Sequence, residues 1–275
     1  MGRILLIDGG EHAAKLAASA ELRQHEIEHC AGNVEALQRL RARAVDVVVT
    51  DPATSIAEDL ALVRELATVR PGVRIVALSQ AASHEELIAA LRAEVYACFV
   101  APFDRAEIVD MIAMALQADG TDGIEVVSGV PQWFTMRVSC HRLTAERIVR
   151  FMTEYQRAIP DEQRDLLIAA FREMLLNAME HGAGFDEDKV IEVTAARTAR
   201  AIVYHFRDPG SGFNRDELSH AAQSAYPDSV LATAIARAER GLRPGGFGML
   251  IARQIADELV YNERGNEVLL IKHLR

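Results

Sequence analysis

Residues 173–182 have the sequence EMLLNAMEHG and lie inside a longer stretch, 162–182, whose apolar residues recur every three or four positions. That spacing predicts a helix with one apolar face. Glu173, Asn177 and His181 follow at intervals of four, so a helix places this carboxylate, amide and imidazole on nearly one side. A solvated polar face at the end of a helix would show the same residues. The stretch therefore predicts a helix, and its chemistry depends on the motifs that follow it.

Two glycine-rich turns follow this helix along the chain. The first is Asp208-x-Gly210-x-Gly212, which comes directly after a predicted hairpin of two strands. The second contains Gly246 and Gly248 and opens a further predicted helix. Glycines ahead of a helix let backbone N–H groups approach phosphate oxygens at its positive end. One such turn is weak evidence, but the ordered set of asparagine helix and two turns indicates a nucleotide site. The strands and helices predicted in this half are 133–140, 144–158, 162–182, 190–196, 201–207, 250–258, 259–262 and 267–274.

The first half of the chain alternates short apolar runs with amphipathic segments five times. Near-continuous apolar strands that alternate with helices predict a doubly wound parallel sheet of five strands, covered on both faces. Such a sheet places its functional groups at the carboxyl ends of the strands, which here carry Asp8, Asp51, Ser79 and Pro102. The predicted strands are 3–8, 26–31, 45–51, 73–79 and 95–100, and the predicted helices are 11–23, 33–43, 58–69, 83–92 and 104–117, with N-caps at Asn33, Ser83 and Asp104.

Length and composition indicate two acidic domains. The 275 residues suit two domains of roughly 100 to 200 residues each, and 50% hydrophobic residues are enough to form cores. Turn-forming residues at 118–123 place the boundary between domains 1–120 and 121–275. The first domain has a net charge of −7 in the total of −10, which argues against direct binding of nucleic acid.

The same composition gives expectations about location. No apolar run approaches the length that a bilayer requires, and we expect no secretory signal and no membrane partner. Cys30, Cys98 and Cys140 are widely spaced among apolar residues, which predicts buried thiols. We therefore expect a cytoplasmic protein.

Residues 3–118 resemble the receiver domain of bacterial response regulators. In that family, an acidic pair after the first strand and an Asp after the third strand hold Mg²⁺, and the latter Asp accepts the phosphoryl group. The resemblance makes Asp51 the candidate phosphoacceptor and gives Ser79 the position of a hydroxyl that contacts the phosphoryl group.

This sequence departs from the receiver pattern at three positions. Asp8 is followed by glycine, so one carboxylate of the acidic pair is missing, and Mg²⁺ should bind more weakly. Ala101 replaces the Lys before Pro102, which removes the cation that stabilises the transferring phosphoryl group. Cys98 replaces the usual aromatic residue. We therefore predict a degenerate receiver that acts as a scaffold, a dimerisation surface or a docking platform, and a phosphorylatable Asp51 remains the alternative.

Residues 131–274 resemble the GHKL ATPase fold, an α/β sandwich of the Bergerat type shared by gyrase, heat-shock chaperone, histidine kinase and mismatch-repair ATPases. The resemblance is strongest to the anti-sigma-factor serine kinases. It implies ATP and Mg²⁺ as ligands, with Asn177 coordinating the metal and Glu173 orienting or deprotonating the nucleophile. Asp208 would accept a hydrogen bond from the adenine amino group, next to Gly210 and Gly212, which let the base pack closely.

The same resemblance assigns the second glycine turn to the phosphates. Gly246 and Gly248 would contact phosphate oxygens, and residues 213–245 would form a lid. Arg243 is the lid residue that could reach the terminal phosphate, and a solvated lid charge is the alternative for it. His181 is interpreted as a helix-end hydrogen-bonding residue and is left outside the catalytic set.

The predicted function is that of a Mg-ATP-dependent serine/threonine kinase module on a degenerate receiver. Nothing at 119–160 resembles the dimerising helical hairpin with a phosphoacceptor His that conventional histidine kinases carry. The expected substrate is a small protein antagonist, in a circuit that sequesters a sigma factor. The alternatives are an ATP-dependent partner-binding switch without kinase activity and a histidine-kinase-like enzyme acting on a separate phosphotransfer protein. Both halves resemble folds that often pair, so a homodimer is a further expectation.

Overall fold

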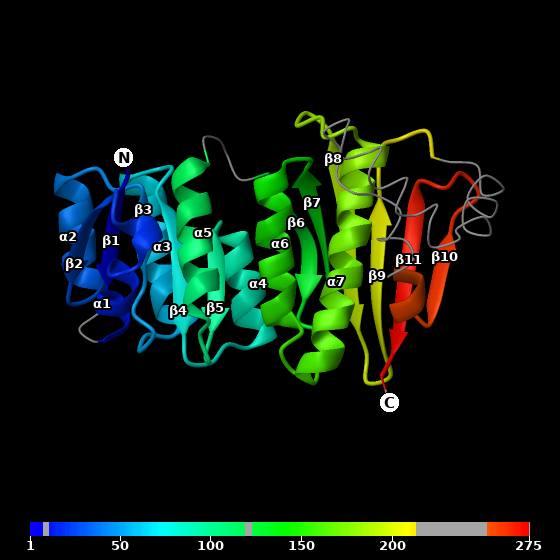
Figure 1. Cartoon of the computed structure of the whole chain (residues 1–275), viewed down its shortest axis with the longest axis horizontal. Coiled ribbons are helices and arrows are strands. Elements are labelled where there is room, and N and C mark those ends of the chain that lie inside the picture. Colours follow the sequence, from blue (N-terminus) through cyan, green and yellow to red (C-terminus); the bar gives the residue numbers. More distant parts are fainter. Residues whose placement is uncertain (8–10, 119–122, 213–251, 275) are drawn as a thin grey trace. The chain divides into compact units, whose positions relative to one another are not determined.

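The computed structural model describes residues 1–7, 11–118, 123–212 and 252–274. By its contacts the chain divides into two compact units (Figure 1). The first unit contains residues 1–124 together with 146–156, and the second contains 125–145 and 157–275. Each unit has its own sheet, and each is described below by itself.

The first unit is built on a five-stranded sheet in the order β2-β1-β3-β4-β5, and every neighbouring pair is parallel. The three valines of β3 are buried on both faces, as a central parallel strand requires. The predicted doubly wound sheet is thus confirmed. Its elements are β1 (Arg3–Ile7), α1 (Glu11–Ala17), η1 (Ala20–Leu22), β2 (Glu26–Cys30), α2 (Asn33–Ala42), β3 (Val47–Val49), α3 (Ile56–Val69), β4 (Arg74–Ser79), α4 (His84–Arg92), β5 (Ala97–Val100) and α5 (Arg105–Gln117).

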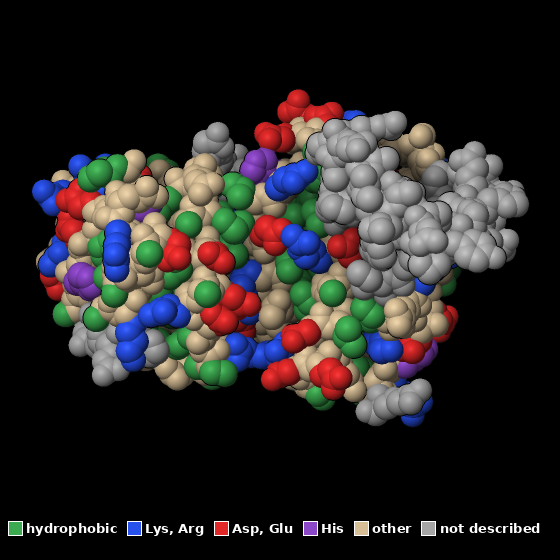
Figure 2. Space-filling model, viewed as in Figure 1, with side chains coloured by type: hydrophobic (Ala, Val, Ile, Leu, Met, Phe, Trp, Pro, Cys, Tyr) green, Lys and Arg blue, Asp and Glu red, His purple; other side chains and the backbone are tan. Residues whose placement is uncertain are grey.

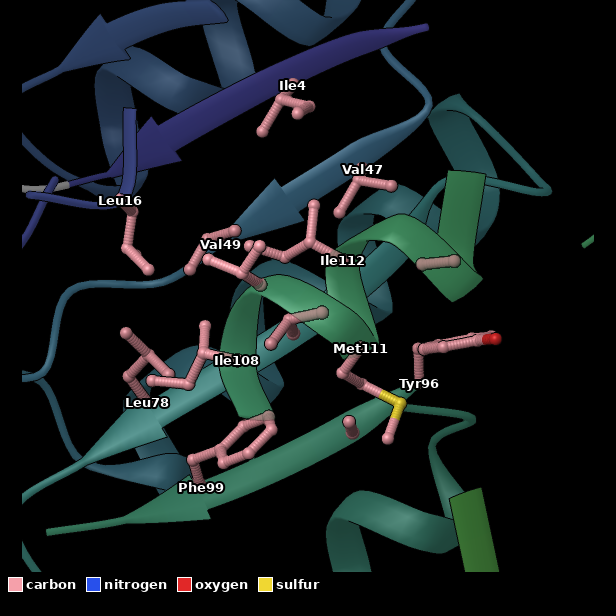
Figure 3. Close-up of a cluster of buried hydrophobic side chains, with 14 of the residues drawn as sticks. Ile4, Leu16, Val47, Val49, Leu78, Tyr96, Phe99, Ile108, Met111 and Ile112 are labelled. Carbon is pink, nitrogen blue, oxygen red and sulfur yellow. The ribbon is translucent and has the colours of Figure 1, made fainter. Parts of the chain in front are cut away.

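Helices cover both faces of this sheet. On one face, α1 and α5 contribute Leu16 and Ile112 to a buried cluster with strand residues such as Val49 and Phe99 (Figure 3). The remaining helices are neighbours of one another, α2 of α3 and α3 of α4. Helices therefore pack against the apolar side chains on both faces of the sheet. This packing holds the carboxyl ends of β3, β4 and β5 at one edge.

Helix starts in the first unit follow the side chains that can cap them. Ser55 and Ser83 form reciprocal capping boxes with the Glu three residues later, at the starts of α3 and α4. Asp104 caps α5 by accepting two backbone N–H groups. The predicted cap at Asn33 is wrong, because Asn33 is the first residue inside α2 and its side chain donates to Asp59 instead.

The second unit contains a six-stranded sheet in the order β10-β11-β9-β8-β7-β6. The neighbouring pairs β10–β11, β11–β9, β9–β8 and β8–β7 are antiparallel. Phe171 of α7 packs its ring against Tyr204 and Phe206 of β9, at centroid distances of 4.9 and 5.2 Å. An α/β layer of this kind is what the sequence predicts. The elements are β6 (Ile124–Val130), β7 (Trp133–Ser139), α6 (Arg142–Tyr155), α7 (Asp161–Asn177), the π-helical turn η2 (Ala178–Gly182), β8 (Val190–Arg197), β9 (Ala201–Arg207), β10 (Glu258–Tyr261) and β11 (Glu267–His273).

Two elements differ from the sequence prediction in this half. The sequence does not predict strand β6, because it is the last strand in the sheet order and all its side chains except that of Ile124 are partly or fully exposed, which leaves a weak alternation in the sequence. The predicted helix at 250–258 is too long, because the described helical residues end at 255 and β10 begins at Glu258. Within the described ranges, every helix is too short or too polar to cross a bilayer.

Candidate functional site

Helix α7 carries the two residues predicted to handle the metal and the nucleophile. Glu173 lies one turn before Asn177, which is the last residue of α7. The helix buries its apolar face, including Met174 and Leu175, and leaves Glu173 and Asn177 partly exposed. After Asn177 the backbone widens into the π-helical turn η2, a feature that is frequent at functional sites. The predicted polar row thus lies on one α-helical face as far as Asn177.

Asp208 comes directly after β9, where two backbone contacts hold it. Its N–H donates to the Asn266 carbonyl oxygen at 3.0 Å, and the Asn266 amide donates to the Asp208 carbonyl oxygen at 3.0 Å. The Asp208 carboxylate accepts the Gly210 N–H at 2.8 Å through Oδ1. One carboxylate oxygen is thus used to shape the turn, and Asn266 fixes the backbone beneath it. Asn266 cannot be recognised from the sequence, since an asparagine in a turn carries no signal of its own.

The end of the α7–η2 segment meets the Asp208 turn at glycines. A side chain at Gly182 would clash with the carboxylate group of Asp208. A Cβ at Gly210 would lie 2.7 Å from the Gly182 carbonyl oxygen and 2.8 Å from Asp208 Oδ1. The sequence pattern predicts Gly182 only as the last residue of a helix. The structure shows that it is also the point where the asparagine helix and the Asp-x-Gly turn come together.

Gly212, the last residue of the turn motif, is held by the loop that joins β10 to β11. Gly212 has a φ of +79°, in the left-handed region that favours glycine. A side chain there would clash with the carbonyl group of Arg264, whose Nε donates to the Ser211 carbonyl oxygen at 3.3 Å. Both glycines of the first turn are therefore required by close backbone approach.

Partial burial sets the electrostatics of this site. Loss of water raises the pKa of Asp208 above its ordinary value, against the lowering effects of the Gly210 N–H and the Arg264 cation. Burial also raises the pKa of the Cys140 thiol to about 11, and Asp208 is one of the nearby charges that add to this. Cys140 is thus a buried, protonated thiol close to the site. Cys30 and Cys98 are buried and free as well, which confirms the prediction for all three thiols.

Residues predicted to handle phosphate in the first unit gather at the carboxyl ends of β3, β4 and β5. The Asp51 carboxylate accepts the Ala53 N–H at 2.8 Å, so one oxygen closes its own turn. Ser79 is 2% exposed, and its hydroxyl contacts the carbonyl oxygens of Ala81 at 2.9 Å and Thr54 at 3.3 Å. Ala101, at the position of the missing Lys, donates its N–H to the Ser79 carbonyl oxygen. The structure therefore brings the expected positions together, with the hydroxyl engaged by backbone.

Several predicted site residues lie outside the described residues. These are Asp8 of the receiver-like edge and Arg243, Gly246, Gly248 and the segment 213–245 of the expected lid. Their roles stay predictions.

The described donor set fits a magnesium ion that arrives with a nucleotide. Asn177 offers an amide oxygen, which is a hard ligand, and Mg²⁺ is commonly held by one or two protein oxygens plus phosphates and water. Among the described residues, no three His, Cys, Asp or Glu side chains form a metal cluster. The glycine contacts around Asp208 place the backbone of Gly182 and Gly210 close against its carboxylate.

Comparison with protein families decides the identity of both halves. Residues 141–272 match the model of the histidine kinase-like ATPase domain, and residues 4–113 match that of the response regulator receiver domain. The chain is a receiver domain fused to a histidine-kinase-like ATPase domain. This combination is that of a bacterial signalling protein that binds ATP.

Receiver domains are among the solved structures similar to the chain. The Francisella response regulator 1452 receiver domain is 19% identical, with a TM-score of 0.38 over 42% of this chain and 98% of its own. A response regulator from Thermotoga maritima is 17% identical, with a TM-score of 0.39 over 43% of this chain and 99% of its own. The HemR receiver domain from Leptospira biflexa is 19% identical, with a TM-score of 0.39 over 44% and 98%. A comparison with curated proteins finds no match.

Proposed function

We propose that the ATPase domain binds Mg-ATP between the end of α7 and the Asp208 turn and transfers the terminal phosphoryl group to a serine or threonine of a protein partner. The observation that carries this proposal is the contact of Gly182 with the Asp208 carboxylate and with Gly210. It joins the segment that bears Glu173 and Asn177 to the turn that would select adenine.

Adenine selection follows from how the Asp208 carboxylate is used. Oδ1 accepts the Gly210 N–H, and within the described part of the chain this is the hydrogen bond of the carboxylate, so we assign the second oxygen as the acceptor for an incoming amino group. Adenine carries an amino group where guanine carries a carbonyl oxygen, and an unpaired buried acceptor is costly. The site therefore favours ATP over GTP.

Phosphoryl transfer requires mainly positioning and charge neutralisation. A bound Mg²⁺ would supply the charge, and Asn177 is the amide that would hold it. Glu173 lies one turn away on the same helix, where its carboxylate would orient the hydroxyl of the substrate and accept its proton. We assign the first unit the role of a degenerate receiver that scaffolds the kinase, in keeping with Ala101 and the engaged Ser79 hydroxyl.

The partner that we propose is a small antagonist protein, in a circuit that controls a sigma factor. Figure 2 shows Lys and Arg side chains mixed with Asp and Glu over the described residues of the face in view, and we propose no direct nucleic-acid partner. A homodimer remains part of the proposal. Co-purification of the native protein, with identification of what it carries, tests the partner.

The decisive experiment combines binding and transfer in the full chain. Glu173→Gln should leave ATP affinity within about twofold of wild type, yet slow labelling of the antagonist by about 100-fold or more. Asp188→Asn, an exposed carboxylate in the same unit, serves as the matched control and should change neither.

Other outcomes of this experiment point to the alternatives. Normal ATP binding without labelling of any candidate would replace the kinase by an ATP-dependent partner-binding switch. An acid-labile product would identify phosphohistidine and hence a histidine-kinase-like enzyme. Failure of the wild type to bind ATP would overturn the proposal altogether.

A further inference from the structure

Helix α6 belongs to the ATPase domain by its sequence, but most of it belongs to the first unit by its contacts. Its residues lie within the segment 141–272 that matches the ATPase domain. Yet residues 146–156 cluster with the first unit, where they pack beside β5 and α5. A helix that begins an ATPase domain and is bound by a receiver-like fold is a candidate connector, and its contacts decide whether it is held firmly.

The first anchor of α6 is Arg147. It is only 4% exposed, and its Nε donates to the Tyr96 carbonyl oxygen at 2.9 Å. The guanidinium carbon lies 4.3 Å from the centre of the Tyr96 ring, within the range of a cation–π interaction. Tyr96 is itself part of the core cluster of the first unit, next to Met111 of α5 (Figure 3). One side chain of α6 thus reaches both the backbone and an aromatic ring of the core.

The second anchor is Arg150, three residues along the same helix. It is 9% exposed, lies 4.8 Å from the centre of the Phe99 ring of β5, and forms an ion pair with Glu107 of α5. Its other nitrogen pairs with Glu154 at 2.6 Å, and Glu154 is 3% exposed. Glu154 also contributes, after burial itself, to the raised pKa of Cys98 on β5. Two carboxylates and one aromatic ring therefore surround this guanidinium.

Buried charges of this kind hold a helix in one position. A guanidinium removed from water requires partners at defined distances, and displacement of α6 would leave charges buried without them. The anchoring is stronger on this ground than an exposed ion pair, which contributes little. Moreover, α6 ends at Tyr155 and α7 begins at Asp161, so only five residues separate the anchored helix from the helix that bears Glu173 and Asn177.

We propose that α6 couples the two halves of the chain: the first unit holds it through Arg147 and Arg150, and its position influences nucleotide affinity through the short connection to α7. This inference rests on the ATP binding proposed above. Coupling of this kind is reciprocal, so ATP must in turn alter the stability of the α6 contacts in the first unit.

The test uses Glu107→Lys in the full chain. Glu107 is a half-exposed residue of α5, so the variant should fold, but a lysine repels Arg150 instead of pairing with it. Asp110→Lys makes the same charge change at an exposed position of the same helix and is the matched control. We expect Glu107→Lys to change the Kd for Mg-ATP by about fivefold or more, and Asp110→Lys to leave it unchanged.

Hydrogen exchange supplies the reciprocal measurement. In the wild type, Mg-ATP should change the protection of amides in β5 and α6, and this response should disappear in Glu107→Lys. Equal ATP affinities in all three proteins, with no response in β5 and α6, would overturn the coupling while ATP binding stands. No ATP binding by the wild type would overturn both proposals. In that case faster exchange of α6 in ligand-free Glu107→Lys would still show that the anchor exists.

Discussion

Asp208 has a partly buried carboxylate, with one backbone N–H and the Arg264 cation to offset its loss of water. Its raised pKa means that the folded protein binds a proton more tightly at this position than the unfolded chain does. An ionised Asp208 therefore costs stability, and the cost accumulates as pH rises from the unfolded pKa to the folded one. A residue with this cost is more readily understood as a binding group than as a structural one.

We predict that Asp208→Asn separates binding from stability. Because Oδ1 serves the Gly210 N–H, the variant would place its amide nitrogen against the adenine amino group, donor against donor. ATP affinity should fall by about 10-fold to 100-fold or more, as measured by calorimetry. The ligand-free variant should be at least as stable as wild type at neutral pH, because the ionised carboxylate is gone.

The stability predicted for Asp208→Asn is checked by measuring thermal unfolding of both proteins as a function of pH. Wild type should lose stability relative to Asp208→Asn as pH rises through the raised pKa of Asp208, and the difference should level off above it. A variant that is less stable than wild type at neutral pH would show that Asp208 is a structural residue.

Gly182→Ala tests the contact between the asparagine helix and the Asp208 turn. The added methyl group would overlap the Asp208 carboxylate, so the turn must shift and ATP affinity should fall by about 10-fold or more. Gly32→Ala is the control, because a methyl group there meets nothing within 4 Å and the backbone is extended. Calorimetry with unchanged affinity in Gly182→Ala would place the nucleotide elsewhere.

At the scale of the element, caps and packing decide where helices begin and what they carry. The α4 start is fixed by Ser83, whose hydroxyl accepts the Glu86 N–H at 3.2 Å while the Glu86 carboxylate accepts the Ser83 N–H at 2.8 Å. Helix α7 is held instead by its buried face, with Phe171 against two aromatic rings of β9. Helix α7 therefore owes its position to the sheet, whereas α4 carries its own start signal.

Ser83→Ala should lower the free energy of unfolding by about 1 kcal/mol, because the Glu86 N–H loses the hydroxyl oxygen that accepts its hydrogen bond. Ser19→Ala is the matched control, since Ser19 precedes η1 without forming a cap hydrogen bond. Chemical denaturation followed by circular dichroism measures both. Equal losses in the two variants would show that the box contributes nothing of its own.

For the whole molecule, the receiver and ATPase domains differ in how much of their family chemistry they keep. The ATPase domain keeps its predicted asparagine helix and first glycine turn, and the two meet in space. The receiver domain keeps its fold and Asp51, but Ala101 stands at the position of the Lys, and the Ser79 hydroxyl contacts two backbone carbonyl oxygens. We therefore expect signals to enter through protein contacts rather than through phosphorylation.

Beryllofluoride with Mg²⁺ should accordingly leave the melting temperature of the full chain unchanged, since neither the full carboxylate set nor the lysine is present to hold it. Differential scanning fluorimetry measures this, and Asp51→Asn is the matched control. A stabilisation in wild type that vanishes in Asp51→Asn would establish Asp51 as a working acceptor.

The elements that could be predicted from sequence are those with a local signal. Apolar periodicity located both sheets' main strands and the long helix, and side-chain chemistry located the caps at Ser83 and Asp104. Strand β6 escaped because its partly exposed side chains leave little alternation. The cap prediction at Asn33 is wrong because an asparagine can either precede a helix as its cap or be the first residue inside it. Here the side chain of Asn33 is bound by Asp59, which lies 26 residues away and gives no local signal.

By itself, the sequence determined the two folds and predicted the site residues, because a strand or helix pattern records which side of one element is buried. Only the tertiary structure decided that Gly182 meets Asp208, that Asn266 supports the turn and that α6 is anchored by the first unit through Arg147 and Arg150. These are contacts between segments far apart in the chain. Their geometry is set by packing across a sheet or between helices, and no local periodicity encodes it.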